Sequence, residues 1–253
     1  DHDPENNILF GEGGAGTFSD GKLTTRTRTP LIRLIHELLV AAKAPEEILV
    51  ASKPHVGTDR LRAVLVFLRR ELERMGASFR FGAKLVDLTL RDGAVSGVVL
   101  EGGEELPASA VILAIGHSAR DTYEALQAQG VALEFKAFQL GLRIEHPQAL
   151  INKAQHGRHA DALPTAEYVV NDRKSGVFSF CMCPGGTIMA SVSEAGCLSS
   201  NGMSRRSRDS GWANSGLVFT VPATLTPGAD TNPLAGVELQ RKLEQHAFSL
   251  GGS

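Results

Sequence analysis

One stretch of the sequence decides how the rest is interpreted: Gly11-Glu12-Gly13-Gly14-Ala15-Gly16-Thr17-Phe18-Ser19-Asp20-Gly21-Lys22-Leu23. It carries five glycines and a lysine, and it follows the apolar run 8–10, which predicts a short strand. Glycine at this density lets the backbone approach a ligand where a side chain would clash. A loop around a phosphate-bearing cofactor has this requirement. We call residues 11–23 the glycine segment.

The glycine segment matches two well-known nucleotide-binding patterns, and we expect neither to operate. Residues 11–16 match the dinucleotide fingerprint, which requires a helix to begin at the third glycine, but Thr17 to Gly21 is a poor helix start. Residues 16–22 match most of a P-loop, but Leu23 stands where a magnesium-binding Ser or Thr is needed. A solvated loop without a ligand stays open as a third interpretation.

The composition is that of an ordinary globular chain. Hydrophobic residues make up 42% of it, and 26 basic against 28 acidic residues give a net charge of −2. This balance predicts no nucleic-acid partner and no membrane partner. The three cysteines are too few for a secreted disulfide framework, which favours the cytoplasm. The sequence begins without Met and ends just after a helical pattern, so we expect an internal fragment of a longer protein.

Local patterns predict helices and strands along most of the chain. Helical spacing of apolar residues indicates helices over 31–39, 58–75, 123–129 and 237–248. Predicted strands cover 78–81, 84–90, 94–100, 104–106, 139–144, 167–170, 177–182, 187–193 and 217–221. The run Val111 to Ile115 is continuously apolar and ends at Gly116, which is typical of a strand buried in a parallel sheet.

Four motifs recur along the chain in a specific order: residues 10–23, Ala114 to Thr122, Gly141 to Pro147, and Phe178 to Gly186 with Asn201 to Ser204. Together they resemble a family of FAD-dependent dehydrogenases, mostly uncharacterised, within the glutathione-reductase-like flavoproteins. The resemblance implies that the true dinucleotide fingerprint lies on a first βαβ unit upstream of this chain. We therefore expect this chain alone to hold FAD weakly.

The predicted fold class is α/β, with α+β character in the second region. A helix, a β-meander and a buried strand are the usual layout of a Rossmann-like FAD/NAD(P)-binding domain. Residues 1–130 would form part of that domain, with the first βαβ unit missing. Residues 131–235 would form a mainly antiparallel β substrate domain, and 236–253 a helix leading back towards the FAD domain.

The resemblance also implies a set of cofactor-binding residues. In the glycine segment these would line the flavin or pyrophosphate, and further along they would meet the adenine or allow a close backbone approach. They are Gly13, Gly14, Gly16, Thr17, Ser19, Leu85, Ala114, Ile115 and Gly116.

Two residues are candidates for a direct role in catalysis. Lys22 would stabilise negative charge on a reduced flavin, or be a solvated cation on a loop. His117 would be a proton donor, since its ordinary pKa lies near neutral pH, or a packing residue beside a helix capped by Ser118. Arg120 and Asp121 are expected to form an adjacent charged pair at that helix start.

The predicted substrate contacts are Arg143, Glu145, Cys181 and Cys183. Arg143 and Glu145 alternate on one strand and share a face, so they would contact a polar substrate or form an ion pair with each other. Cys181 and Cys183 share a face by the same argument and would have a redox role or pack as small buried residues. Arg205, Arg206 and Arg208 predict an exposed loop, with a contact to an NAD(P)H phosphate as the alternative. No metal site is expected.

The function predicted from the sequence is FAD-dependent oxidation and reduction of a small molecule. Hydride would pass through flavin N5, and NAD(P)H is a possible electron donor. The alternatives are a P-loop-like nucleotide hydrolase and a non-catalytic flavin-binding protein. The substrate and the oligomeric state stay open.

Overall fold

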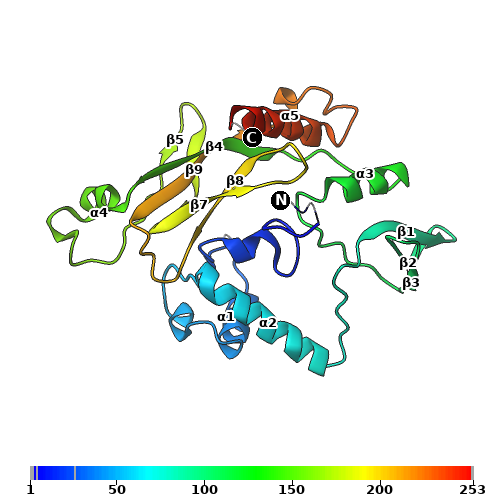
Figure 1. The fold of residues 1–253 in the computed structure, drawn as a ribbon, viewed down its shortest axis with the longest axis horizontal. Coiled ribbons are helices and arrows are strands. Elements are labelled where there is room, and N and C mark those ends of the chain that lie inside the picture. Colours follow the sequence, from blue (N-terminus) through cyan, green and yellow to red (C-terminus); the bar gives the residue numbers. More distant parts are fainter. Residues whose placement is uncertain (1–2, 4, 26, 252–253) are drawn as a thin grey trace. The chain divides into compact units, whose positions relative to one another are not determined.

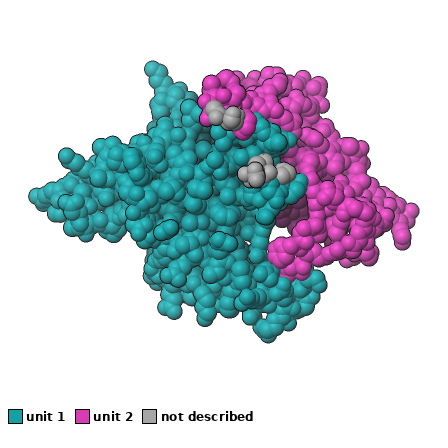
Figure 2. Space-filling model, viewed as in Figure 1, with its two compact units in different colours: residues 1–78, 139–220 teal, residues 79–138, 221–253 magenta. Residues whose placement is uncertain are grey.

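The computed structural model describes residues 3, 5–25 and 27–251 (Figure 1). The chain divides into two compact units, which Figure 2 colours separately. The first unit comprises residues 1–78 and 139–220, and the second comprises 79–138 and 221–253. Each unit is described by itself. The functional division predicted at residues 130 and 235 stays a prediction.

The first unit contains a helical core next to the glycine segment. The apolar stripe of α2 packs with the residues after α1, and the buried cluster includes Ala42, Ile48 and Val64. Gly76, two residues beyond α2, has a φ of +97°, as a glycine that ends a helix often does. The helices of this unit are η1 (Gly14–Phe18), α1 (Leu31–Ala41), η2 (Glu46–Leu49), α2 (Thr58–Arg74), α4 (Gln148–His156) and η3 (Gly157–His159).

The first unit also contains a four-stranded sheet with the order β4-β9-β6-β5 and a separate hairpin of β7 and β8. The β7–β8 hairpin has an unbroken antiparallel register from Gly186 opposite Ser204 to Ser191 opposite Ser199. β8 contacts both β6 and η1, so the glycine segment lies beside this hairpin (Figure 1). The strands are β4 (Phe138–Pro147), β5 (Asn171–Asp172), β6 (Val177–Cys183), β7 (Gly186–Ser191), β8 (Ser199–Ser204) and β9 (Trp212–Val221).

The second unit is built on the predicted meander. β1 (Leu85–Arg91), β2 (Ala94–Leu100) and β3 (Glu105–Pro107) form an antiparallel sheet in sequence order. The two turn residues Asp92 and Gly93 both have positive φ, which a tight hairpin turn of the primed type requires. α3 (Arg120–Ala128) packs on β1, and η4 (Ala223–Leu225) and α5 (Ala235–Leu250) complete the unit.

The prediction of a buried strand at residues 111–115 is wrong. These residues form no strand, and Ile112 and Leu113 are 92% and 39% exposed. A strand buried on both faces needs pairing partners on either side. Among the described residues no strand pairs with this run. The structure thus shows a mixture of helices and antiparallel sheets, an α+β arrangement, and it does not show a Rossmann-like domain.

Other local predictions also differ from the structure. Residues 8–10 form a turn, in which the Phe10 amide donates to the Asn7 carbonyl at 3.3 Å, and 78–81 and 167–170 form no strand. The sequence patterns missed α4 and β8. β8 is rich in serine and poor in β-branched and aromatic residues, so its pairing with β7 overrides its weak local preference.

No helix in the described part of the chain combines the length and the apolar character that crossing a bilayer requires.

Candidate functional site

The glycine segment folds as a short turn of helix followed by an extended piece, entirely within the first unit. η1 ends at Phe18, and the Ser19 hydroxyl accepts a hydrogen bond from the Gly21 amide at 3.0 Å. Lys22 then forms a β-bridge with His55. Among the described residues from Gly16 to Pro30, no α-helix begins, and the first α-helix starts at Leu31. The structure therefore confirms that neither nucleotide-binding pattern has its required context.

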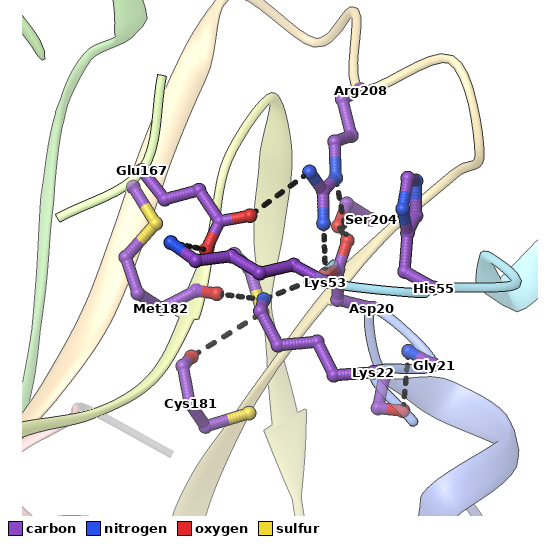
Figure 3. Close-up of polar contacts among 12 residues, drawn as sticks. Asp20, Gly21, Lys22, Lys53, His55, Glu167, Cys181, Met182, Ser204 and Arg208 are labelled. Atoms are coloured by element: carbon purple, nitrogen blue, oxygen red, sulfur yellow. Dashed lines mark hydrogen bonds and ion pairs between the residues drawn. The ribbon is translucent and has the colours of Figure 1, made fainter. Parts of the chain in front are cut away.

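Asp20 is the centre of a buried network (Figure 3). Its side chain is 2% exposed and accepts two hydrogen bonds from Arg208, at 2.5 Å from Nη2 to Oδ2 and 3.1 Å from Nε to Oδ1. Lys22 Nζ lies 2.6 Å from the same carboxylate, and the Ser204 hydroxyl also donates to it. A buried carboxylate is tolerated when it is paired in this way.

The network continues to a second carboxylate. Arg208 Nη1 lies 3.3 Å from Glu167 Oε1, and Lys53 Nζ lies 3.9 Å from Glu167 Oε2. We call Asp20, Lys22, Lys53, Glu167 and Arg208 the charge cluster. Because it holds three cations and two carboxylates, the cluster carries one excess positive charge. A site of this kind favours an anionic group.

Burial and the charges of the cluster together shift the pKa values of Asp20 and of the nearby His55. Burial raises the pKa of Asp20, but the hydrogen bonds and charges of Arg208 and Lys22 outweigh it, and the pKa lies below its ordinary value of 3.8. Desolvation and the Arg208 charge lower the pKa of His55. At neutral pH, Asp20 is therefore ionised and His55 is mostly neutral.

The backbone near Arg208 lies very close to the turn between β6 and β7. A Cβ atom at Gly185 would lie 1.7 Å from the Arg208 carbonyl oxygen, so only glycine fits there. Arg208 itself has a φ of +53°, which is uncommon for a residue other than glycine. The exposed loop that the sequence predicted is found at Arg205, but not at Arg208, which is 12% exposed and held by two carboxylates.

The two cysteines lie at a bulge in β6. The pairing of β6 with β9 shifts register between Phe180 and Cys183, and Cys181 has a φ of +48°. Alternation of side chains, on which the shared face of Cys181 and Cys183 was predicted, is not kept across a bulge. The Cys183 thiol donates to the Cys181 carbonyl at 3.4 Å.

Arg143 contacts the bulge from β4, which is separated from β6 by β9 in the sheet. Its Nη1 donates to the Cys181 carbonyl at 3.3 Å and to Asn214 Oδ1 at 2.7 Å. A Cβ atom at Gly202 would lie 2.3 Å from this nitrogen, so the glycine makes room for the guanidinium. Glu145, the other residue predicted on this face, is exposed.

The two thiols differ in acidity. The hydrogen bond from Cys183, followed by the charges of Arg143 and Lys22, lowers the pKa of Cys181 to about 6 against the effect of burial. The same hydrogen bond and burial raise the pKa of Cys183. Of the two sulfurs, Cys181 is the one whose ionisation is favoured.

A cavity of about 480 Å³ adjoins the charge cluster. It is lined in part by Gly185, Gly186, Arg205 and Ser210. Ser204 also lines it and donates its hydroxyl to Asp20, so the cavity and the buried carboxylate share a wall.

The predicted cofactor-binding residues of the glycine segment differ in their packing. Residue 13 must be glycine for packing reasons, because a Cβ atom there would lie 2.3 Å from both Leu65 Cδ1 and Thr17 Oγ1. At Gly16 an added Cβ would meet nothing within 4 Å, and at Gly14 it would meet only a carbonyl oxygen at 3.8 Å. The buried Thr17 hydroxyl has no hydrogen-bond partner within the described residues. An open glycine backbone beside an unused hydroxyl fits a polar cofactor.

The remaining predicted residues lie in the second unit. Leu85 begins β1, Ala114 is exposed, Ile115 is partly buried, and Gly116 has a φ of +76°. Desolvation and the Arg120 charge lower the pKa of His117, while Glu244 opposes them.

Arg120 and Asp121 do not pair with each other as predicted. Arg120 is buried and lies 2.7 Å from Glu244 of α5, and Asp121 lies 2.8 Å from Lys84. Neighbours in a helix point in different directions, so each finds a partner on a different element.

The sequence patterns did not identify the residues whose hydrogen bonds and ion pairs link the parts of the site. Asp20, Glu167 and Asn214 were not singled out, and Arg208 was assigned to an exposed loop. The one local signal was an acid two residues before Lys22. Among the described residues no group of three or more His, Cys, Asp or Glu side chains is placed to hold a metal ion.

Comparison with known proteins supports a flavin connection. Residues 137–253 match the family model described as FAD-dependent protein, C-terminal domain-like. The chain is 47% identical over 254 residues to a protein of Clostridium beijerinckii that is described as uncharacterized. The match covers 98% of this chain and 47% of the relative, so the chain spans about half the length of that relative. The region from β4 to α5 is thus similar to the C-terminal domain of FAD-dependent proteins.

Proposed function

We propose that this chain is part of an FAD-dependent oxidoreductase acting on a small molecule, with NAD(P)H as a candidate electron donor. The observation that carries the proposal is the match of residues 137–253 to a domain of FAD-dependent proteins. The open backbone at Gly16 and the unused Thr17 hydroxyl support it. When bound, FAD would supply the hydride chemistry at flavin N5.

In this proposal the glycine segment holds the cofactor and the charge cluster tunes it. The backbone at Gly14 and Gly16, with Thr17 and Ser19, would bind polar groups of FAD. Lys22 is 28% exposed and belongs to a cluster with an excess positive charge. That charge would favour an anionic pyrophosphate or a reduced flavin.

The cofactor contacts expected in the second unit stay a separate proposal. Leu85 and the residues from Ala114 to Gly116 would offer backbone groups to FAD. The lowered pKa of His117 leaves its imidazole mostly neutral at neutral pH. His117 would then accept a proton rather than donate one, which refines the role expected from the sequence.

The first experiment asks whether the longer relative is a flavoprotein. We expect the Clostridium beijerinckii protein to purify with a flavin that is released on denaturation and identified as FAD by mass spectrometry. A colourless protein that also takes up no added FAD would overturn the proposal. Flavin that is bound but not reduced by NADH, NADPH or any substrate tested would favour a non-catalytic flavin-binding protein.

The second experiment tests the glycine segment in this chain. FAD is titrated into wild type, Gly16→Val and the control Ala190→Val, and quenching of flavin fluorescence is followed. Valine at residue 16 enters open space and should leave the fold intact, but it blocks a close approach to the backbone. We expect Gly16→Val to weaken binding about tenfold or more, equivalent to about 1.4 kcal/mol. Equal affinities of the three proteins would remove the glycine segment from the cofactor site.

A further inference from the structure

A groove of about 490 Å³ lies along α2 in the first unit, and no residue assigned to the flavin lines it. Three cations and three apolar residues form its walls. Those supplied by α2 recur at helical spacing, so they share one face of the helix. The remaining one follows α1. The lining residues are Lys43, Arg62, Ala63, Val66, Phe67 and Arg70. We call this surface the α2 groove.

The cations of the α2 groove have no carboxylate partner in the part of the chain that the structure describes. Lys43, Arg62 and Arg70 are exposed, and none of the three forms an ion pair there. Arg69 and Arg74 of the same helix lie outside the groove, and each pairs with a glutamate. The groove therefore presents positive charge that the described chain does not balance.

Lys43 occupies a backbone position that favours glycine. It follows the end of α1 with a φ of +73°. Its amide donates to the Val40 carbonyl at 2.9 Å, and the Ala44 amide donates to the Leu39 carbonyl at 2.8 Å. This pair of bonds is a Schellman ending, in which glycine usually takes the left-handed position. A lysine there strains the backbone, so its side chain in the groove is better explained by binding than by stability.

We propose that the α2 groove is a docking site for an acidic amphipathic helix of a partner protein. Ala63, Val66 and Phe67 would contact the apolar anchors of that helix, and the cations would pair with its acidic side chains. Anchors at helical spacing that enter a groove are a recurrent mode of peptide recognition. No flavin takes part, so the inference goes beyond the proposed function and does not depend on it.

The positions of the cations favour a helix over a fatty acid or another amphiphile with one charge. Arg62 and Arg70 lie four residues before and four residues after Val66 on α2. They are therefore about 12 Å apart along the helix axis. A fatty acid carries its charge at one end and would leave one arginine unmatched. A helix with acidic residues about two turns apart and apolar residues between them matches both.

Binding is measured by fluorescence anisotropy with a labelled, alanine-rich peptide of about 16 residues, a length that allows a helix in water. Two glutamates about eight residues apart flank leucines on the same face. We expect this peptide to bind, and its affinity to fall as the salt concentration rises. The matched peptide with glutamine at both positions should bind about tenfold more weakly. Equal affinities of the two peptides, or no binding of either, would overturn the proposal.

Charge-reversal variants locate the bound peptide. Arg62→Glu and Arg70→Glu should each weaken binding about tenfold, because attraction becomes repulsion. The control Arg173→Glu makes the same change at an exposed arginine in the turn after β5 and should leave the affinity unchanged. Circular dichroism verifies that each variant is folded. Equal losses in all three variants would show unspecific charge attraction and refute the groove as the site.

The variant Lys43→Gly separates binding from folding. Glycine adopts the left-handed conformation without strain, so the variant should unfold at a higher urea concentration than wild type. It should nevertheless bind the acidic peptide more weakly, because a charge of the groove is lost. An unchanged affinity would contradict the role of Lys43 in docking.

Two other occupants of the groove are tested in parallel, by co-sedimentation with vesicles that contain phosphatidylserine and by sedimentation velocity of the protein alone. We expect neither vesicle binding nor a dimer that depends on the groove. Vesicle binding that Arg62→Glu and Arg70→Glu abolish, without peptide binding, would replace the helix by a lipid surface. A dimer that the same variants dissociate would replace it by a second copy of the chain. Either result would overturn the proposal.

Discussion

Arg120 of the second unit is buried and Arg208 of the first unit is 12% exposed, and the surroundings of these two arginines differ. Arg208 of the first unit joins Asp20 and Glu167, which lie 188 and 41 residues away in the sequence. Arg120 of the second unit projects from α3 and meets Glu244 of α5 at 2.7 Å and Gln240 at 3.4 Å. The first is surrounded by other cations on a strained loop, and the second is a pair between two helices.

The contrast separates a candidate binding site from a packing contact. The charge cluster around Arg208 has an excess positive charge, a cavity at its edge and a left-handed backbone at Arg208. The Arg120 contact balances one charge with one charge between regular helices. Each arginine forms an ion pair with a carboxylate, but the two carboxylates differ in their access to water. Asp20 is 2% exposed and Glu244 is 16% exposed.

The largest effect is expected for Arg208→Met. The variant leaves Asp20 buried with Lys22 and Ser204 as its partners, and a buried carboxylate that loses its main partner is costly. We expect the free energy of unfolding to fall by about 3 kcal/mol. Urea unfolding followed by Trp212 fluorescence measures it, since the single tryptophan lies in β9 of the same unit. Arg33→Met, at an exposed pair with Glu37 on α1, is the control.

Acid titration checks the cause of that loss. The pKa of Asp20 in the folded state lies below its ordinary value of 3.8. The contact between Arg208 and Asp20 therefore stabilises the protein fully at pH values above 3.8. The stabilisation is lost as the pH falls through the lowered value, since the unfolded state then binds the proton first. Wild type should therefore lose stability in this range more steeply than Arg208→Met. Parallel curves would mean that Arg208 acts through packing rather than through the Asp20 charge.

A smaller effect is expected for Arg120→Met. Glu244 is partly exposed and can be hydrated when its partner is removed, so the loss should be about 1–2 kcal/mol. Hydrogen exchange of peptides from α3 and α5, followed by mass spectrometry, measures it where the contact lies. A loss as large as that of Arg208→Met would show that access of the carboxylate to water does not govern the cost.

The parts of the fold that follow from neighbouring residues were predictable. The apolar stripe of α2 and the Asp92-Gly93 turn of the meander are local patterns, and the structure confirms both. The absence of an α-helix at the third glycine of the segment was also predictable, because a missing helix start can be recognised within a few residues.

The parts that depend on distant partners were not predictable. Asp20 meets an arginine 188 residues away, and no local pattern marks either residue as a partner of the other. The bulge at Cys181 removes the alternation from which a shared face was inferred. The run 111–115 has the composition of a buried strand, but burial requires neighbouring strands, and composition does not supply them.

The smallest loss in the free energy of unfolding is expected for Arg80→Ala, although the contact of Arg80 has the better hydrogen-bond geometry. Arg80 makes two hydrogen bonds to Glu104, at 3.0 and 2.7 Å, and this pairing lowers the pKa of Glu104. Both side chains are about half exposed, at 47% and 54%, so water replaces the contact when it is lost. We expect no resolvable change in urea unfolding followed by circular dichroism. If Arg80→Ala destabilised the protein as much as Arg120→Met, bond geometry rather than burial would rank these three arginines.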